Sequence, residues 1–348
     1  MKKINLPRDE GKHSSFLEWW YFNGNLKDSK NNLYAFMLCL FRIRPDKVKI
    51  PFLKIPVREM FFLHFLFVDI KNKRRVSKIV PYVILKKDSF KNNKLKASGY
   101  FFDLDGIKNF RIEKAGNNIY EIETDILKLS LISKKKPLLI NGNGFINYGK
   151  RKSYYYSLTD LEAKGEIKIN GKSLDVSGKV WHDHQWANEK YAKDKWSWFS
   201  IQLDNNVELM IFEYFFESNK KKLLSIIYPN GKQKFYENFE LRHGKKIWES
   251  KITSMEYPLK WRIKLKENID LSCSVFLDNQ EVLFGSINYW EGPIKVKGFF
   301  DDKIINGTGF MELNYPFNIK RFFDMKELYN EVERYINKLS LLTLWLKK

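Results

Sequence analysis

The chain consists of short apolar runs that are separated by turn signals. Runs of about four to eight residues rich in Ile, Val, Phe, Tyr and Trp have the length and composition of strands. Between them stand Asn-Gly and Asp-Gly pairs, at residues 23–24, 105–106, 141–142, 170–171, 230–231 and 306–307. Such pairs favour the tight turns that join antiparallel strands. Many short strands with tight turns are typical of barrels and sandwiches, so the pattern predicts an all-β protein.

The C-terminal segment has a different period. Between Asp324 and Leu346, apolar residues recur at spacings of three and four, namely Met325, Leu328, Val332, Tyr335, Ile336, Leu339 and Leu342. This spacing predicts an amphipathic α-helix, with Asp324 as its N-cap. The last residues are apolar nearly all round, so the helix either packs on the β-structure or lies in a membrane interface.

Two pairs of similar segments indicate an internal duplication. Residues 20–37 resemble residues 198–211, with Trp20 aligned to Trp198, because each segment is an aromatic strand, a turn and a second apolar strand. Residues 177–183 align without gaps with residues 306–312, and a Lys-Gly pair that opens a hairpin precedes each segment. Chance similarity between short hairpins is the alternative explanation.

The second alignment places Asp183 and Glu312 at equivalent points of two halves. We therefore expect two tandem antiparallel barrels, in residues 1–185 and 186–320, followed by the helix in residues 321–348. A chain of 348 residues is long enough for two such domains.

The chain is strongly basic, with 62 Lys and Arg against 41 Asp and Glu and a formal net charge of +21. This excess favours anionic partners, among them a membrane surface with anionic lipids. The alternative is a composition common to all proteins of the source organism, because the lysines are scattered rather than massed. No nucleic-acid-binding signature accompanies the charge, so we expect no nucleic-acid partner.

Compartment and cofactor signals are few. Cys39 and Cys273 are too sparse for a disulfide framework, which indicates a reducing, cytoplasmic environment. The N-terminus lacks the apolar core of a secretory signal, and the longest apolar run, Met60 to Val68, is shorter than the ~18 residues that span a bilayer. The sequence also lacks a Gly-x-Ser-x-Gly elbow, a phosphate loop and a dinucleotide fingerprint. We therefore expect chemistry without a cofactor, or simple binding.

Side chains that can take part in catalysis or ligand binding concentrate in segment 178–186, which holds an acid, two imidazoles and two indoles. Strand alternation places Trp181, Asp183 and Gln185 on one face and His182, His184 and Trp186 on the other. Segments 18–22 and 196–199 are also rich in aromatic residues. This concentration fits a pocket for a large apolar ligand.

These segments also carry a family resemblance. In chain order, residues 18–24, 62–65, 153–157, 178–186, 196–203 and 289–292 resemble the carotenoid 1,2-hydratase (hydroxyneurosporene synthase) and AttH-like superfamily. The resemblance covers residues 10–315. It implies two lipocalin-like domains, with a ligand pocket at or near their interface.

In the carotenoid hydratases, an acid protonates an alkene and water captures the cation, without a cofactor. The essential aspartate of the family falls on Asp183. Burial among aromatic rings would raise its pKa. Trp181 and either Tyr154 or Tyr156 would then offer ring faces to the cation. The hydratases have Tyr in place of Trp181 and His-x-Trp in place of residues 154–156, and these departures match the hydrolase-like branch of the superfamily better.

The resemblance thus implies Asp183, Tyr154 and Tyr156 as catalytic residues of a hydro-lyase or isomerase acting on an isoprenoid or carotenoid-like ligand. Its pocket would be lined by Trp181, His182, His184, Trp186, Glu18, Trp20, Trp198 and Glu291. The alternative is a lipocalin-like carrier that binds an apolar ligand without changing it.

Several of these residues also have a structural interpretation. Asp183 would then be a carboxylate that accepts hydrogen bonds from an indole or an amide, and Glu291 would form an interdomain hydrogen bond. His182 and His184 have the spacing of a metal pair, but no further ligands are evident among His13, His64 and His243. We therefore expect no metal.

Overall fold

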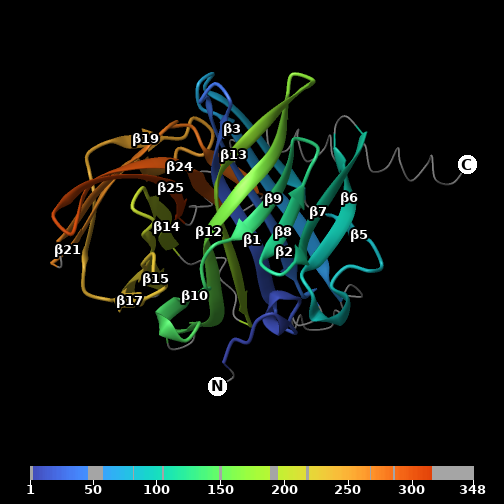
Figure 1. Cartoon of the computed structure of the whole chain (residues 1–348), viewed down its shortest axis with the longest axis horizontal. Helices are drawn as coiled ribbons and strands as arrows, with labels where there is room; N and C mark the ends of the chain where they lie inside the picture. The colour runs from blue at the N-terminus through green and yellow to red at the C-terminus, as the bar shows by residue number, and fades with distance from the viewer. Residues whose placement is uncertain are drawn as a thin grey trace, which may run out of the picture.

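The computed structural model describes residues 3–45, 58–80, 82–103, 106–148, 151–188, 195–216, 219–266, 268–284 and 287–315. Within these ranges the chain forms two large curled antiparallel sheets, so the all-β prediction is confirmed (Figure 1). Helical structure in these ranges is confined to short 3-10 turns, and no helix there has the length and apolar character to cross a membrane. The helix expected in residues 321–348 lies outside the described residues.

The first sheet has thirteen strands in the order β4-β3-β2-β1-β13-β12-β9-β8-β7-β6-β5, with β10 and β11 paired to β12. Their bounds are β1 Leu17–Asp28, β2 Leu33–Ile43, β3 Met60–Asp69, β4 Arg74–Val80, β5 Ile84–Leu85, β6 Lys96–Asp103, β7 Gly106–Gly116, β8 Ile119–Glu123, β9 Leu127–Ser133, β10 Leu138–Leu139, β11 Phe145–Tyr148, β12 Arg151–Ile169 and β13 Lys172–Ala187. Three 3-10 turns lie at η1 Arg8–Glu10, η3 Lys91–Asn93 and η4 Ile140–Gly142.

The second sheet has ten strands in the order β17-β16-β15-β14-β25-β24-β22-β21-β18, with β23 paired to β24. Their bounds are β14 Lys195–Leu203, β15 Glu208–Phe216, β16 Asn219–Ile227, β17 Gln233–Tyr236, β18 Glu240–His243, β21 Lys260–Leu265, β22 Ile269–Val275, β23 Glu281–Phe284, β24 Ile287–Phe300 and β25 Lys303–Asn314. Strands β19 Ile247–Glu249 and β20 Glu256–Pro258 form a separate two-stranded sheet.

The strand order of the first sheet recurs in the second. Strands β4-β3-β2-β1-β13-β12 correspond to β17-β16-β15-β14-β25-β24, as a duplication predicts. Asp183 pairs with Tyr21, and Glu312 pairs with Trp198, at corresponding points of the two sheets. Trp198 therefore corresponds to Tyr21, one residue from the Trp20 that the sequence similarity aligned with it. Successive strand residues face opposite sides of a sheet. The shift of one residue therefore places Trp198 on the face that corresponds to Tyr21, opposite to that of Trp20.

Three apolar cores follow from this arrangement. One fills the interior of the first sheet and includes Trp20 and Tyr156. A second fills the interior of the second sheet. The third lies between the sheets, where Tyr21 and Trp181 from the first sheet meet Trp198 from the second. Strand β13 contributes one face to the first core and the other face to the third, so the fold places its acid at the interface of the two sheets.

Candidate functional site

The alternation expected along β13 is confirmed. Trp181 and Asp183 face the second sheet, whereas His182, His184 and Trp186 face the interior of the first sheet. The predicted site residues therefore form two groups that cannot line one pocket. The interface group contains Asp183, Trp181, Trp198 and Glu291. The interior group contains Glu18, Trp20, Tyr154, Tyr156, His182, His184 and Trp186.

Asp183 is buried at the interface, with 3% of its surface exposed. Its Oδ1 accepts hydrogen bonds from the Trp181 indole at 2.6 Å and from the Ser157 hydroxyl at 2.5 Å. Its Oδ2 accepts one from the Tyr155 hydroxyl at 2.6 Å. Burial raises the pKa of Asp183 to about 7, although hydrogen bonds from the three donors act in the opposite direction. A substantial fraction of this carboxyl group therefore carries a proton at neutral pH.

Tyr155, and not Tyr154 or Tyr156, lies beside Asp183. The prediction that Tyr154 or Tyr156 lies there is wrong. Ser157 lies opposite Asp183 in the β12–β13 pair, and odd-numbered residues of this stretch therefore share its face. Tyr154 points the other way and stacks on Trp186, with ring centroids 5.4 Å apart. Tyr156 also faces the interior of the first sheet.

The second sheet contributes two further carboxyl groups. Glu291 and Glu312 are paired across β24 and β25. Glu291 accepts a hydrogen bond from the Tyr21 hydroxyl of the first sheet, which confirms the interdomain hydrogen bond expected for it. Glu312 accepts one from the Trp196 indole at 2.6 Å, and its side chain is only partly buried.

Burial and neighbouring carboxyl groups raise the pKa values of the two glutamates. Burial and then the neighbouring Glu312 hold the pKa of Glu291 well above its ordinary value. Burial raises the pKa of Glu312 to about 7, with a smaller contribution in the same direction from Asp183. Since like charges at close range cannot all ionise, the cluster retains protons near neutrality. It can therefore both donate and accept a proton there.

Aromatic rings surround these acids. The Trp198 indole donates to the Tyr155 hydroxyl at 3.0 Å, and its ring lies edge-on to Tyr21 at 5.5 Å between centroids. Phe41 stacks on Phe62 at 4.9 Å. Partly buried aromatic side chains pack against the same interface core, namely Trp19, Phe41, Trp196, Phe212 and Phe235. The interface that holds the acids thus includes aromatic side chains that retain some exposure.

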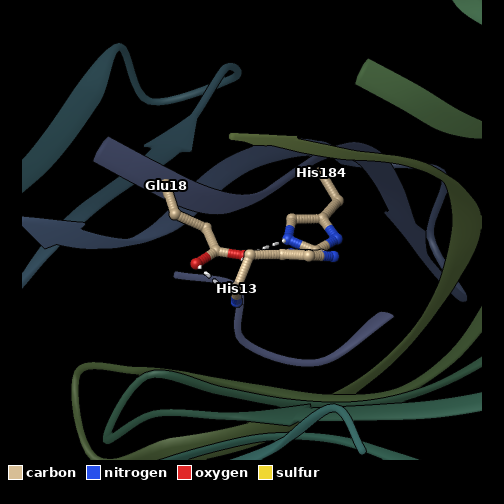
Figure 2. Close-up of side chains that lie close together, drawn as sticks. All are labelled: His13, Glu18 and His184. Carbon is tan, nitrogen blue, oxygen red and sulfur yellow. Dashed lines mark hydrogen bonds and ion pairs between the residues drawn. The ribbon is translucent and has the colours of Figure 1, made fainter. Parts of the chain in front are cut away.

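The interior group is organised around Glu18 (Figure 2). Glu18 Oε1 lies 2.7 Å from His13 Nδ1 and 3.0 Å from His184 Nε2, and its Oε2 accepts from the guanidinium of Arg42. Burial acts to raise the pKa of Glu18, but hydrogen bonds from the two histidines outweigh it and lower the pKa to about 2. Burial lowers the pKa of His184, so this imidazole is neutral. His13 also stacks on Trp186, with centroids 3.8 Å apart.

The ligand atoms of His13, Glu18 and His184 lie within 4.8 Å of one another, a separation that a metal ion can bridge. The charge of Glu18 is already balanced by Arg42, and both side chains are fully buried. A divalent cation bound to this carboxylate would lie next to the positive charge of Arg42 and be repelled by it. The three residues therefore do not fit a metal site. These residues instead form a hydrogen-bond network that fastens the segment before β1 to β13.

The site contains residues that the sequence analysis did not select. Tyr155 and Ser157 lie in the aromatic segment it singled out, but the strand register decides which of them face Asp183. Glu312 was recognised only as the counterpart of Asp183, and Tyr21 only as part of an aromatic run. Their contribution depends on the packing of the two sheets, which no local pattern encodes.

Comparisons with known proteins agree with this arrangement. The AttH-like family matches residues 1–315. A protein described as AttH from Nitrosomonas europaea has a similar structure, with a TM-score of 0.70, 22% identity, and coverage of 91% of this chain and 98% of the other. Kievitone hydratase from Nectria haematococca is also similar, with a TM-score of 0.67, 16% identity, and coverage of 90% of this chain and 93% of the other. No curated protein matches the chain.

The two solved structures share the fold of this chain over nearly their whole length. Since the family match covers all of the described residues, the chain belongs to the AttH-like family.

Proposed function

We propose that this protein adds water to, or isomerises, a carbon–carbon double bond of a large apolar ligand at the interface of its two sheets, with Asp183 as the acid. The observation that carries the proposal is the carboxyl group of Asp183, which is buried between the sheets and has a pKa raised to about 7. An acid with a pKa near the working pH is well matched to proton transfer. The similarity in fold to a hydratase supports the proposal.

The arrangement suggests a proton path for hydration. Asp183 gives its proton to one alkene carbon, and the other carbon becomes a cation. The indoles of Trp181 and Trp198 would present electron-rich rings to this cation. Water then bonds to the cation through its oxygen, and its extra proton passes to the carboxylate of Glu312. The ligand gains one water, and the proton lost by Asp183 is balanced by the one gained at Glu312.

A second function has its own support. Both oxygens of Asp183 are already occupied by three donors of the fold, as in a purely structural carboxylate. In that case the partly buried aromatic side chains would hold an apolar ligand, which the protein would carry unchanged. In either case we propose an isoprenoid or carotenoid-like compound as the ligand.

The test compares the parent protein with Asp183→Asn on an organic extract of the source cells, with products followed by mass spectrometry. We expect the parent to convert a compound into an isomer or into a product heavier by one water, and Asp183→Asn to slow this at least ~100-fold. Asparagine is nearly isosteric, so folding and retention of the extracted ligand should not change.

Asp175→Asn is the matched control, because Asp175 is an exposed carboxylate on the same strand. The proposal fails if Asp183→Asn converts the compound at the parental rate. It also fails if both the melting temperature and ligand retention collapse in this variant, because Asp183 would then be structural.

A further inference from the structure

The second sheet and the two-stranded sheet of β19 and β20 border an open cavity that is separate from the acid cluster. Its volume is about 550 Å³, within the usual size of small-molecule sites. It lies on the concave side of β14 and β15, where it faces β18, β20 and β21. Lys195 of β14 lines this cavity, whereas its neighbour Trp196 points to the interface and binds Glu312. The two sites therefore use opposite faces of the same strand.

Much of the cavity wall is apolar. Side chains of this kind come from five strands and from the residue after β25, namely Phe215, Leu241, Ile247, Pro258, Trp261 and Tyr315. Trp261 is almost completely buried, and its indole donates to the carbonyl oxygen of Pro258 at 2.8 Å, so its ring is held in place. Such a wall suits the hydrocarbon or aromatic part of a ligand.

Lys195 is the distinctive polar group of the cavity. Its ammonium lies 4.1 Å from the ring centroid of Tyr315 and 5.2 Å from that of Phe215. Burial lowers its pKa, because part of its hydration shell has been replaced by these rings. Among the described residues no carboxylate lies in ion-pair contact with this ammonium. A half-desolvated cation on aromatic faces gains from an anionic ligand.

The other basic groups of the cavity already have partners. Lys220 pairs with Glu213 at 2.5 Å, and Arg242 pairs with Glu240 at 3.1 Å. The carboxylate of Glu213 is therefore engaged by Lys220. Lys195 is therefore the cation that is left to meet a ligand, in a wall that is about half apolar and that also includes the carboxylate of Glu256.

We propose that this cavity binds an apolar carboxylate, with the carboxylate on the ammonium of Lys195 and the apolar body against Phe215 and Trp261. The ligand is thus defined by one negative end and an aliphatic or aromatic remainder that fits within the cavity. This site does not depend on Asp183 and is distinct from the proposed catalytic interface.

The test measures binding of a dansyl-labelled undecanoic acid to the full chain by fluorescence. We expect saturable binding that weakens at least ~10-fold in Lys195→Met, because a charge-assisted contact is lost. Lys195→Arg should bind within about threefold of the parent, since it retains the charge. The methyl ester of the probe should bind at least ~10-fold more weakly than the acid.

Lys297→Met is the control for loss of one positive charge, because Lys297 is exposed on β24 and away from the cavity. Circular dichroism and thermal melting establish that each variant is folded. Equal affinity of the parent and Lys195→Met, or of the acid and its ester, would overturn the proposal, as would the absence of saturable binding. Asp183→Asn should leave this affinity unchanged, so failure here would not bear on the catalytic proposal.

Discussion

At the residue scale, the chemistry of Asp183 depends on the balance between burial and three donors. Burial alone would favour the neutral acid, and each hydrogen bond favours the carboxylate. Tyr155 also accepts from Trp198 of the second sheet, so its hydroxyl joins Asp183 to the opposite sheet. Both sheets thus contribute to the proton affinity of this carboxyl group.

Tyr155→Phe should therefore raise the pKa of Asp183. The substitution removes a donor to the charged form, so the carboxyl group should titrate at higher pH, and turnover in the acid-catalysed step should change by at least ~10-fold. Tyr154→Phe is the matched control, because Tyr154 faces the other side of β12. Identical pH profiles for the two variants would show that Tyr155 does not tune Asp183.

The sequence predicted which residues share the face of Asp183 and that an indole could donate to it, but not which side of the sheet this face meets or which tyrosine contacts the acid. Alternation along β13 follows from a local period, and it separated Asp183 from His182 and His184 correctly. The choice among Tyr154, Tyr155 and Tyr156 required the register between β12 and β13, which depends on pairing between distant segments.

At the element scale, two glycines allow neighbouring strands to approach closely. Gly165 on β12 and Gly298 on β24 occupy corresponding places in the two sheets. A Cβ added at Gly298 would lie 2.0 Å from the carbonyl oxygen of Asp270, and one added at Gly165 would lie 2.1 Å from that of Lys128. The Lys-Gly pairs noted in the sequence therefore have a steric reason in both sheets.

Gly298→Ala should lower the free energy of unfolding by about 1–3 kcal/mol, because backbone atoms of β22 would have to move. Chemical denaturation of the full chain measures this change. Lys297→Ala, at an exposed neighbouring position, should stay within about 0.5 kcal/mol of the parent. If the two variants were equally stable, the close approach at Gly298 would have no energetic consequence.

The strands and hairpins were predictable because their signals are local. Apolar runs identified the strands, and the Asn-Gly pairs at 170–171 and 230–231 lie between strands. The pairs at 23–24 and 306–307 instead lie inside β1 and β25, so not every Asn-Gly pair marks a turn. The similar order of the strands in the two sheets is the order that a duplication predicts. The alignment of Trp20 with Trp198 was wrong by one residue, because both segments are rich in aromatic residues on both faces, so similarity alone does not fix the register.

At the scale of the whole molecule, the two sheets are joined by buried polar contacts as well as by apolar packing. Lys135 lies between β9 and β10 of the first sheet, and its Nζ is 2.6 Å from Oε2 of Glu208 on β15. The side chain of Glu208 is fully buried. Burial raises the pKa of Glu208 to about 7. Burial also raises the pKa values of Asp183 and Glu312. These contacts were not predictable, because the sequence does not say which outer surfaces of two domains meet.

The raised pKa values set the sign of the pH dependence of stability. Between about pH 4 and pH 7, the native state holds protons on these carboxyl groups that the unfolded chain has released. Their contribution to stability is therefore fully present below pH 4 and is lost as the pH rises through 7.

Lys135→Met should make this dependence steeper. At pH 8, Glu208 would be buried without its cation, and the free energy of unfolding should fall by about 3 kcal/mol. At pH 5, where Glu208 is protonated, the loss should be about 1 kcal/mol. Urea denaturation at the two pH values measures both. Lys179→Met, which removes a partly exposed cation near the same contact, should have a smaller effect than Lys135→Met at pH 8. Equal losses for Lys135→Met at pH 5 and pH 8 would contradict the assignment.

We expect the interface of the two sheets to keep the carboxyl group of Asp183 protonated near neutrality. Infrared titration of the carboxyl groups, with the parent spectrum compared with that of Asp183→Asn, tests it most directly. We predict that the variant lacks a protonated carboxyl signal that titrates near pH 7 in the parent. If the difference spectrum instead shows a carboxyl group that titrates near its ordinary pKa of about 4, Asp183 is not the acid of this protein.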